Sequence, residues 1–259
     1  MSSEGDVVQI GTSADVPAVT QSSQESQHRS KEDTVGITSS VKAFAMCAAL
    51  NSCNLGFDIG VNAGTADLIQ KDLSLTDEEL EVFIGSINLF GMVGAIGASY
   101  VSDKLGRRST FRFAAYGFII GIIITALSKS FLSLMFGRIF VGIGVGCGLA
   151  IDPLYISEIS PAVHRGYLVT WSELAINLGI VLGFLSLLIY GPVEDDLQWR
   201  LMVLTGAILP CVMIYLSTYL MPESPRWLVS QGKLIEAKEV LTQLYPPGKF
   251  KFDALQILS

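Results

Sequence analysis

Six long apolar stretches separated by short polar segments dominate the chain between residues 43 and 221. Each is long enough to cross the hydrocarbon core of a bilayer, which takes ~20 residues in a helix. The pattern therefore predicts an all-α membrane protein with six transmembrane helices. The predicted spans are residues 43–63, 82–101, 111–128, 131–156, 167–190 and 200–221.

The segments that flank this predicted bundle, residues 42–222, are polar. Residues 1–41 are rich in Ser, Thr, Gln and acidic residues and almost lack aromatic ones, which predicts a disordered tail. We expect no cleavable signal peptide, because the first apolar run starts late and is long enough to span.

Residues 223–259 are predicted to form a cytosolic helical segment. The sequence indicates a short helix, a break at Gly232 and then an amphipathic helix. That second helix would lie against the cytosolic face of the bundle or form a solvated linker helix. Its predicted apolar face consists of Leu234, Ala237, Val240, Leu241 and Leu244.

Composition and charge support this interpretation and set the orientation. Half of the residues are hydrophobic and the mean hydropathy is +0.50, which is rare in soluble domains. With a cytosolic N-terminus, 13 of the 17 Lys and Arg residues fall on the cytosolic side and only Lys71 and Lys129 outside. The positive-inside rule therefore places both termini in the cytosol. The net charge of −7 does not indicate a nucleic-acid partner, and we expect none.

Two residue types within the spans have a structural explanation. All four cysteines lie in spans at spacings that suggest neither a metal site nor a disulfide, so we expect no metal and no cofactor. Glycines recur every four residues, which lets helix backbones approach closely in lipid. These glycines are Gly56, Gly60 and Gly64, Gly142 and Gly146, and Gly179 and Gly183.

Charged residues inside the spans need a different explanation. An ionisable group in the bilayer interior costs several kcal/mol, so it normally faces a partner or a water-filled cavity. Asp58 and Arg138 are each predicted to lie ~12 Å from the outer end of their spans at a 1.5 Å rise per residue. We therefore expect a buried Asp58–Arg138 pair. It would be either a static pair that fixes helix register or a switch in which Asp58 binds and releases a proton. The switch is an alternative because burial and the arginine shift the pKa of the carboxyl group in opposite directions.

Glu173 and Asn177 are four residues apart and therefore share one face of the fifth span. Together with the glycines of that span, they would form a polar stripe that suits a polyhydroxylated ligand, because they offer strong acceptors and donors. The alternative is a cluster of interhelical hydrogen bonds without a ligand.

Several motifs resemble a known family. The loop "SDKLGRRS", with Asp103, Gly106, Arg107 and Arg108, resembles the D-x-x-G-R-R motif of the major facilitator superfamily. Further motifs resemble its sugar porter family, and "WSELAINLGIVLGF" is most similar to plant-type polyol and monosaccharide transporters. The sugar porter motifs are "GFDIGVNAG", "GRIFVGIGVG", "PLYISEISPAVHRG", "WRLM" and "PESPRW".

The resemblance implies roles for matching positions, and transport rather than enzymatic activity. Asp58 matches the aspartate of proton symporters, and Arg138 its partner in span four. Glu173, with Asn177 on the same face, falls where the family contacts sugar. A cytosolic charge network would latch the outward-facing state through solvent-accessible and individually weak pairs. Its residues would be Asp103, Arg107, Arg108, Glu158, Arg165, Glu223 and Arg226.

Three positions depart from the family pattern. Typical hexose porters carry Gln where Glu173 stands, and often a second Gln where Ile180 stands. Asp152, just before Pro153, occupies a position that is usually neutral. It would accept from Ser or from backbone groups freed by the proline, or line the inner cavity.

The resemblance covers residues 41–245, which correspond to the N-terminal six-span half of a twelve-span fold. We expect a proton-coupled symporter of monosaccharides or polyols, truncated after its first half, in the plasma membrane or in a vacuolar or other endomembrane. The alternative is a non-transporting half-transporter that regulates full-length sugar transporters. In either case self-association or pairing with a C-terminal half is expected. An aspartyl protease that uses Asp58 and Asp152 is disfavoured, because Asp152 would lie ~21 Å below Arg138.

Overall fold

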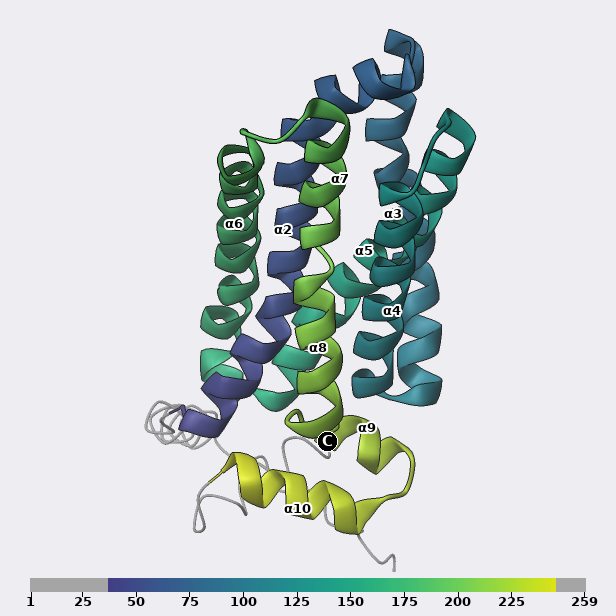
Figure 1. Cartoon of the computed structure of the whole chain (residues 1–259). Coiled ribbons are helices and arrows are strands. Elements are labelled where there is room, and N and C mark those ends of the chain that lie inside the picture. The colour runs from purple at the N-terminus through teal and green to yellow at the C-terminus, as the bar shows by residue number, and fades with distance from the viewer. Residues whose placement is uncertain (1–36, 246–259) are drawn as a thin grey trace, which may run out of the picture. The chain divides into compact units, whose positions relative to one another are not determined.

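The computed structural model describes residues 37–245, and these residues form helices without any strand. The described residues do not include residues 1–36, which belong to the predicted tail of residues 1–41. They also do not include residues 246–259 of the predicted cytosolic segment. The elements are α2 (Ser39–Leu73), α3 (Asp77–Leu105), α4 (Arg107–Ala126), α5 (Phe131–Ile159), a 3₁₀ turn (Ala162–His164), α6 (Arg165–Tyr190), α7 (Asp195–Thr205), α8 (Ile208–Tyr219), α9 (Pro225–Ser230) and α10 (Leu234–Leu244) (Figure 1).

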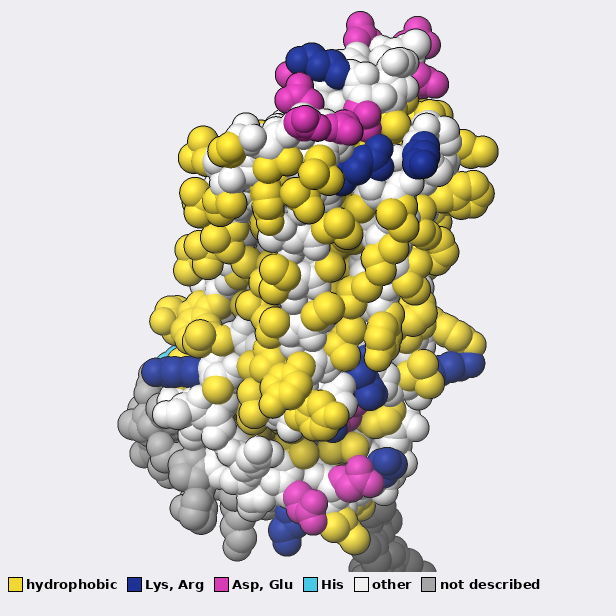
Figure 2. Space-filling model, in the orientation of Figure 1, with side chains coloured by type: hydrophobic (Ala, Val, Ile, Leu, Met, Phe, Trp, Pro, Cys, Tyr) yellow, Lys and Arg dark blue, Asp and Glu magenta, His cyan; other side chains and the backbone are white. Residues whose placement is uncertain are grey.

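Six helical segments in the described part of the chain are long and apolar enough to cross a membrane, which confirms the predicted fold class. The sixth segment consists of α7 and α8, which are separated at Gly206 and Ala207. Figure 2 shows apolar side chains covering the middle of the visible face, with the acidic side chains toward its two ends and most of them at the top. The chain is therefore an integral membrane protein.

The first helix extends ten residues beyond its predicted end at residue 63. α2 continues to Leu73 because this extension is apolar on one side and packs against neighbouring helices. Ile69 belongs to a buried cluster at this end of the bundle, together with Phe83 of α3, Leu134 of α5 and Trp199 of α7. α3 then begins with a capping box between Thr76 and Glu79, which satisfies backbone N–H groups that a helix start leaves unpaired.

Close contacts between helix backbones occur at most of the glycines predicted to make them. At Gly56 and Gly179, where α2 meets α6, a Cβ atom would collide with the backbone of the facing helix. The same is true at Gly146, where α5 meets α3. Gly64 is the exception, because a Cβ there would meet only side chains at ordinary contact distance. The glycines thus set how closely α2 and α5 approach their neighbours.

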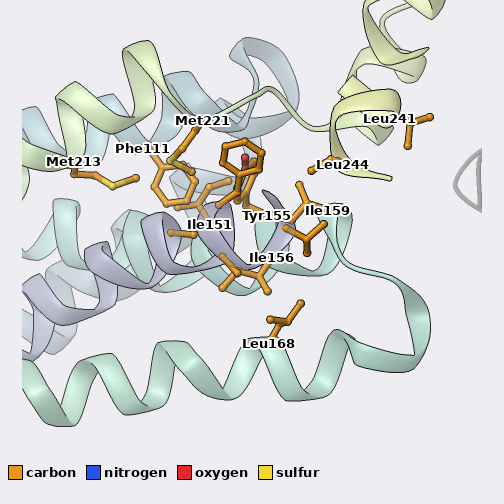
Figure 3. Close-up of a cluster of buried hydrophobic side chains, with 14 of the residues drawn as sticks. Phe111, Ile151, Tyr155, Ile156, Ile159, Leu168, Met213, Met221, Leu241 and Leu244 are labelled. Atoms are coloured by element: carbon orange, nitrogen blue, oxygen red, sulfur yellow. The ribbon is translucent and has the colours of Figure 1, made fainter. Parts of the chain in front are cut away.

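The last two helices pack against one end of the bundle. Leu241 and Leu244 of α10 join a buried cluster with Tyr155 and Ile159 of α5 (Figure 3). The Tyr245 hydroxyl donates to the Ile159 carbonyl at 3.1 Å. Of the two alternatives for this segment, docking against the bundle is therefore confirmed. Its predicted apolar face was wrong in one residue, because Leu234 is 61% exposed and lies at the start of the helix, outside this contact.

A glycine-to-alanine pair tests the backbone contacts. Gly146→Ala should lower the free energy of unfolding by ~1–3 kcal/mol, because the new methyl group overpacks the contact with Gly91 of α3. Gly97→Ala, on an exposed face of α3 with open space around it, is the control and should stabilise by ~0.5–1 kcal/mol through helix propensity. The measurement is chemical unfolding of the purified chain in detergent. Equal effects of the two variants would contradict the packing role.

Candidate functional site

The predicted pair between α2 and α5 forms. Arg138 Nη1 lies 3.4 Å from Asp58 Oδ2, and the two side chains are only 3% and 17% exposed. The guanidinium also stacks on the Phe83 ring of α3, with Arg138 Cζ 3.9 Å from the ring centroid. The predicted contact between Asp58 and Arg138 is confirmed, and together with Phe83 it connects α2, α3 and α5.

A third polar side chain, Asn62, connects the two charged groups. Its Nδ2 donates to Asp58 Oδ2 at 2.8 Å and to the Asp58 backbone carbonyl at 2.6 Å. Its Oδ1 accepts from Arg138 Nη2 at 2.6 Å. Asn62 was not among the predicted site residues, although its position four residues after Asp58 places it on the same helix face. That spacing, which also linked Glu173 and Asn177, is the signal that could have found it.

A cavity of about 450 Å³ borders these three side chains. Its walls come from α2, α3 and α5 and are mostly apolar, with a few convergent polar groups, as is typical of small-ligand sites. Asp58 and Arg138 are the only charged residues that line it. The lining residues are Asp58, Ile59, Asn62, Ala63, Ala66, Ile84, Ile87, Asn88 and Arg138.

Glu173 and Asn177 share a face of α6, as predicted, and both are exposed. Asn177 Nδ2 donates to the Glu173 backbone carbonyl at 2.8 Å, which leaves the Glu173 carboxylate and Asn177 Oδ1 available. The predicted stripe was wrong in its glycines, because Gly179 and Gly183 face α2 on the buried side of the helix. Neither polar residue lines the cavity around Asp58.

Asp152 is buried between α5 and α2. Its carboxylate accepts from Asn51 Nδ2 at 3.0 Å and from the Ser52 hydroxyl. Only 1% of the residue is exposed, so of the two alternatives the structure supports hydrogen bonding to a serine, and not lining of a cavity. Asp152 and Asp58 have separate partners and do not share a site.

The predicted charge network has a buried ion pair at its centre. Arg107 donates from Nε and Nη2 to the two Glu158 carboxylate oxygens, each at 2.8 Å. The two side chains are 8% and 5% exposed, so the prediction of solvent-accessible pairs was wrong here. Asp103 adds a longer contact to Arg107 at 3.4 Å. Removing one partner of a buried bidentate pair leaves an uncompensated charge, which is strongly destabilising.

Glu223 and Arg108 complete this network through backbone groups. Glu223 Oε1 accepts from the backbone N–H groups of Arg107 at 2.8 Å and Arg108 at 3.3 Å, and so caps the start of α4. Burial raises the pKa of the Glu223 carboxyl, while the backbone donors and Arg108 act in the opposite direction. Arg108 donates to the carbonyls of Ser217 and Thr218 at 2.9 and 2.6 Å, at the end of α8.

Gly106 makes the close approach of Glu223 possible. Its φ is +89°, and a Cβ there would collide with the Glu223 carboxylate. The other two predicted members are not brought into the network. Arg165 and Arg226 are exposed, and in the part of the chain that the structure describes neither pairs with these residues.

Comparisons with known proteins agree with the motifs. Residues 44–254 match the family model "Sugar (and other) transporter". Probable polyol transporter 4 of Arabidopsis thaliana is 43% identical over 201 residues, which cover 78% of this chain and 38% of that protein. Polyol transporter 5 of Arabidopsis thaliana is also 43% identical, over 77% of this chain and 37% of that protein. The chain thus spans about two fifths of the length of these curated relatives.

Solved structures show the same fold. The proton:xylose symporter XylE, a major facilitator superfamily protein, has a TM-score of 0.79 and 25% identity over 86% of this chain and 53% of that chain. A partially occluded inward-open conformation of XylE from E. coli has the same score and identity over 85% of this chain. The predicted resemblance is confirmed, and the family is one of transporters rather than enzymes. The chain belongs to the sugar transporter family of the major facilitator superfamily, whose N-terminal half it matches.

Proposed function

We propose that this chain provides the proton-coupling helices of a proton-driven symporter of monosaccharides or polyols. The observation that carries the proposal is the buried Asp58–Arg138 pair beside a cavity. The names of the relatives, polyol transporters and a proton:xylose symporter, support this substrate class and this driving ion.

The proposed coupling uses the charge of Asp58. When the carboxylate binds a proton from the cavity, its attraction to Arg138 falls and the link between α2 and α5 weakens. When the proton leaves, the pair forms again. Because the pair is largely shielded from water, this change in charge is worth more than it would be at a surface. A single proton can therefore bias the arrangement of two helices.

For the substrate, we propose that Glu173 and Asn177 accept hydrogen bonds from its hydroxyl groups. Both are exposed on an otherwise apolar membrane helix, where a carboxylate that faced lipid would be costly. This face of α6 would therefore border a water-filled substrate path. Further helices, from a C-terminal half or a second copy, would form the opposite wall.

For the cytosolic side, we propose that the pair between Arg107 and Glu158 and the cap from Glu223 hold α4, α5 and the segment after α8 together in one transport state. The distribution of Lys and Arg supports a cytosolic location for this network, for residues 1–41 and for residues 223–259. The proposed membrane is the plasma membrane.

Replacing the proposed proton carrier tests the coupling. Uptake is measured in proteoliposomes that contain a chimera. In this chimera, the chain is joined to the part of polyol transporter 5 that follows the matched region. Asp58→Asn should reduce accumulation to the external substrate concentration and spare substrate exchange, because the amide cannot carry a proton. Asp67→Asn, at an exposed position of the same helix, is the control. Uphill accumulation by Asp58→Asn would refute the proposal.

The same chimera tests the substrate contact. Glu173→Ala should raise the apparent KM for polyol or monosaccharide ~10- to 100-fold, since an unpaired hydroxyl partner costs ~1–3 kcal/mol. Glu81→Ala, at an exposed position of α3, should leave KM unchanged. If KM for sorbitol, inositol, xylose and glucose does not change in Glu173→Ala, these residues do not contact the substrate.

The raised pKa of Glu223 predicts a pH dependence of stability. The folded state holds this proton more tightly than the unfolded state, so the added stability is present at acid pH and lost as pH rises through the folded value. Relative to Glu223→Gln, the wild-type chain should therefore lose free energy of unfolding as pH rises. Unfolding titrations of both proteins measure this difference, with exposed Glu239→Gln as the control. A difference that grows in the opposite direction would show that the cap favours the ionised form.

A further inference from the structure

We propose that Asn62 is a positioning residue that holds Arg138 when Asp58 is protonated, an inference that rests on the proposed coupling role of Asp58. Asn62 lies between the two charged groups and contacts both. It accepts from Arg138 at 2.6 Å, whereas the direct contact between Arg138 and Asp58 is 3.4 Å long. The amide oxygen is therefore the nearer acceptor for the guanidinium.

The burial of Arg138 explains why a second acceptor matters. Arg138 is 2% exposed, and its Nε has no hydrogen-bond partner in the described residues. If Asp58 became neutral and Arg138 had no other acceptor, a buried cation would lose most of its compensation, which is costly. Asn62 Oδ1 provides an acceptor that does not depend on the charge of Asp58.

The geometry of Asn62 also keeps the ion pair open. Its Nδ2 donates to Asp58 Oδ2, the same oxygen that faces Arg138 Nη1. The contact of Arg138 with Asp58 therefore lacks the bidentate geometry that Arg107 forms with Glu158. A looser pair beside a cavity costs less to separate.

Other charged groups on the surrounding helices do not replace Arg138 or Asp58. On α7, Arg200 pairs with Asp72 at 2.8 Å, at the outer end of α2. Glu173 on α6 is exposed and does not line the cavity. The acidic residues of α3 lie near its two ends, Asp103 in the last turn and the others in or near the first turn. Helix α8 carries no charged residue, and the charged residues of α10 lie at the other end of the bundle.

The test measures the stability cost of losing Asn62 as a function of pH, with the 259-residue chain itself in detergent. Asn62→Leu removes the amide's three hydrogen bonds to Asp58 and Arg138 and keeps the number and branching of the side-chain heavy atoms. At mildly alkaline pH, Asp58 and Arg138 can close on each other, so the cost should be small. At acid pH, where Asp58 is neutral, Asn62→Leu should lower the folding equilibrium constant roughly tenfold more than it does at alkaline pH. This is the effect expected when Arg138 loses a hydrogen bond to the amide.

Two further variants decide the interpretation. Asn88→Leu, in the same cavity but outside the hydrogen bonds of the pair, should have a cost that does not vary with pH. In an Asp58→Asn background, Asn62→Leu should lower the free energy of unfolding at every pH. The matched control is Asn88→Leu in the same background. If the double variant with Asn62→Leu fails to fold and the control double variant folds, this is the extreme form of the expected result.

A cost of Asn62→Leu that does not depend on pH would overturn the proposal and leave Asn62 as a structural residue. A cost that is largest at alkaline pH would also overturn it, because Asn62 would then serve mainly the ionised carboxylate. No transport is measured, so failure here is distinct from failure of the proposed symport, which the accumulation assay with Asp58→Asn tests separately.

Discussion

A guanidinium buried among membrane helices needs an acceptor within hydrogen-bond distance, because hydrocarbon offers none. Arg138 finds its acceptors, Asp58 and Asn62, on α2, and the Phe83 ring of α3 covers its face. These contacts require α2, α3 and α5 to lie close together. The glycine contact between α3 and α5 provides part of that spacing, since any side chain at Gly146 would push these two helices apart.

The three acidic or basic groups of α5 are arranged along its length, and each has a partner on another helix. Arg138 meets α2 nearest the start of α5, Asp152 meets Asn51 and Ser52 of α2 further along, and Glu158 meets Arg107 of α4 near the end of α5. Of these three groups, only Arg138 borders the cavity of about 450 Å³. We infer that the contacts of Asp152 and Glu158 fix α5 in place, while the pair of Arg138 and Asp58, although largely shielded from water, can exchange protons with the cavity.

Much of this arrangement was predictable from the sequence, because the bilayer imposes strong rules on apolar length and on buried charge. Six spans, the pairing of Asp58 with Arg138 by depth, and glycine contacts followed from those rules. The extension of α2 to Leu73 could not be predicted from those rules, because it contains too few apolar residues for a span. These residues are buried through contacts with residues of other helices, such as Phe83 and Trp199.

The polar partners were harder to predict than the charges. Asn51, Ser52 and Asn62 are neutral, so the cost of burying a charge does not single them out. Asp152, the partner of Asn51 and Ser52, and Arg138, one partner of Asn62, lie on a helix distant in sequence. Helix rotation was a second difficulty. It places Gly179 and Gly183 against α2 and leaves Glu173 on the opposite side, and it leaves Arg165 and Arg226 outside the charge network.

The most direct test of proton coupling at Asp58 is the movement of protons that accompanies the substrate. Proteoliposomes that contain the chimera with polyol transporter 5 are placed in weakly buffered medium with a pH indicator, without an imposed gradient, and polyol is added outside. The proposed symport predicts alkalinisation of the medium in step with polyol entry, and none when Asp58 is replaced by Asn. Saturable polyol entry without any change in external pH would contradict it.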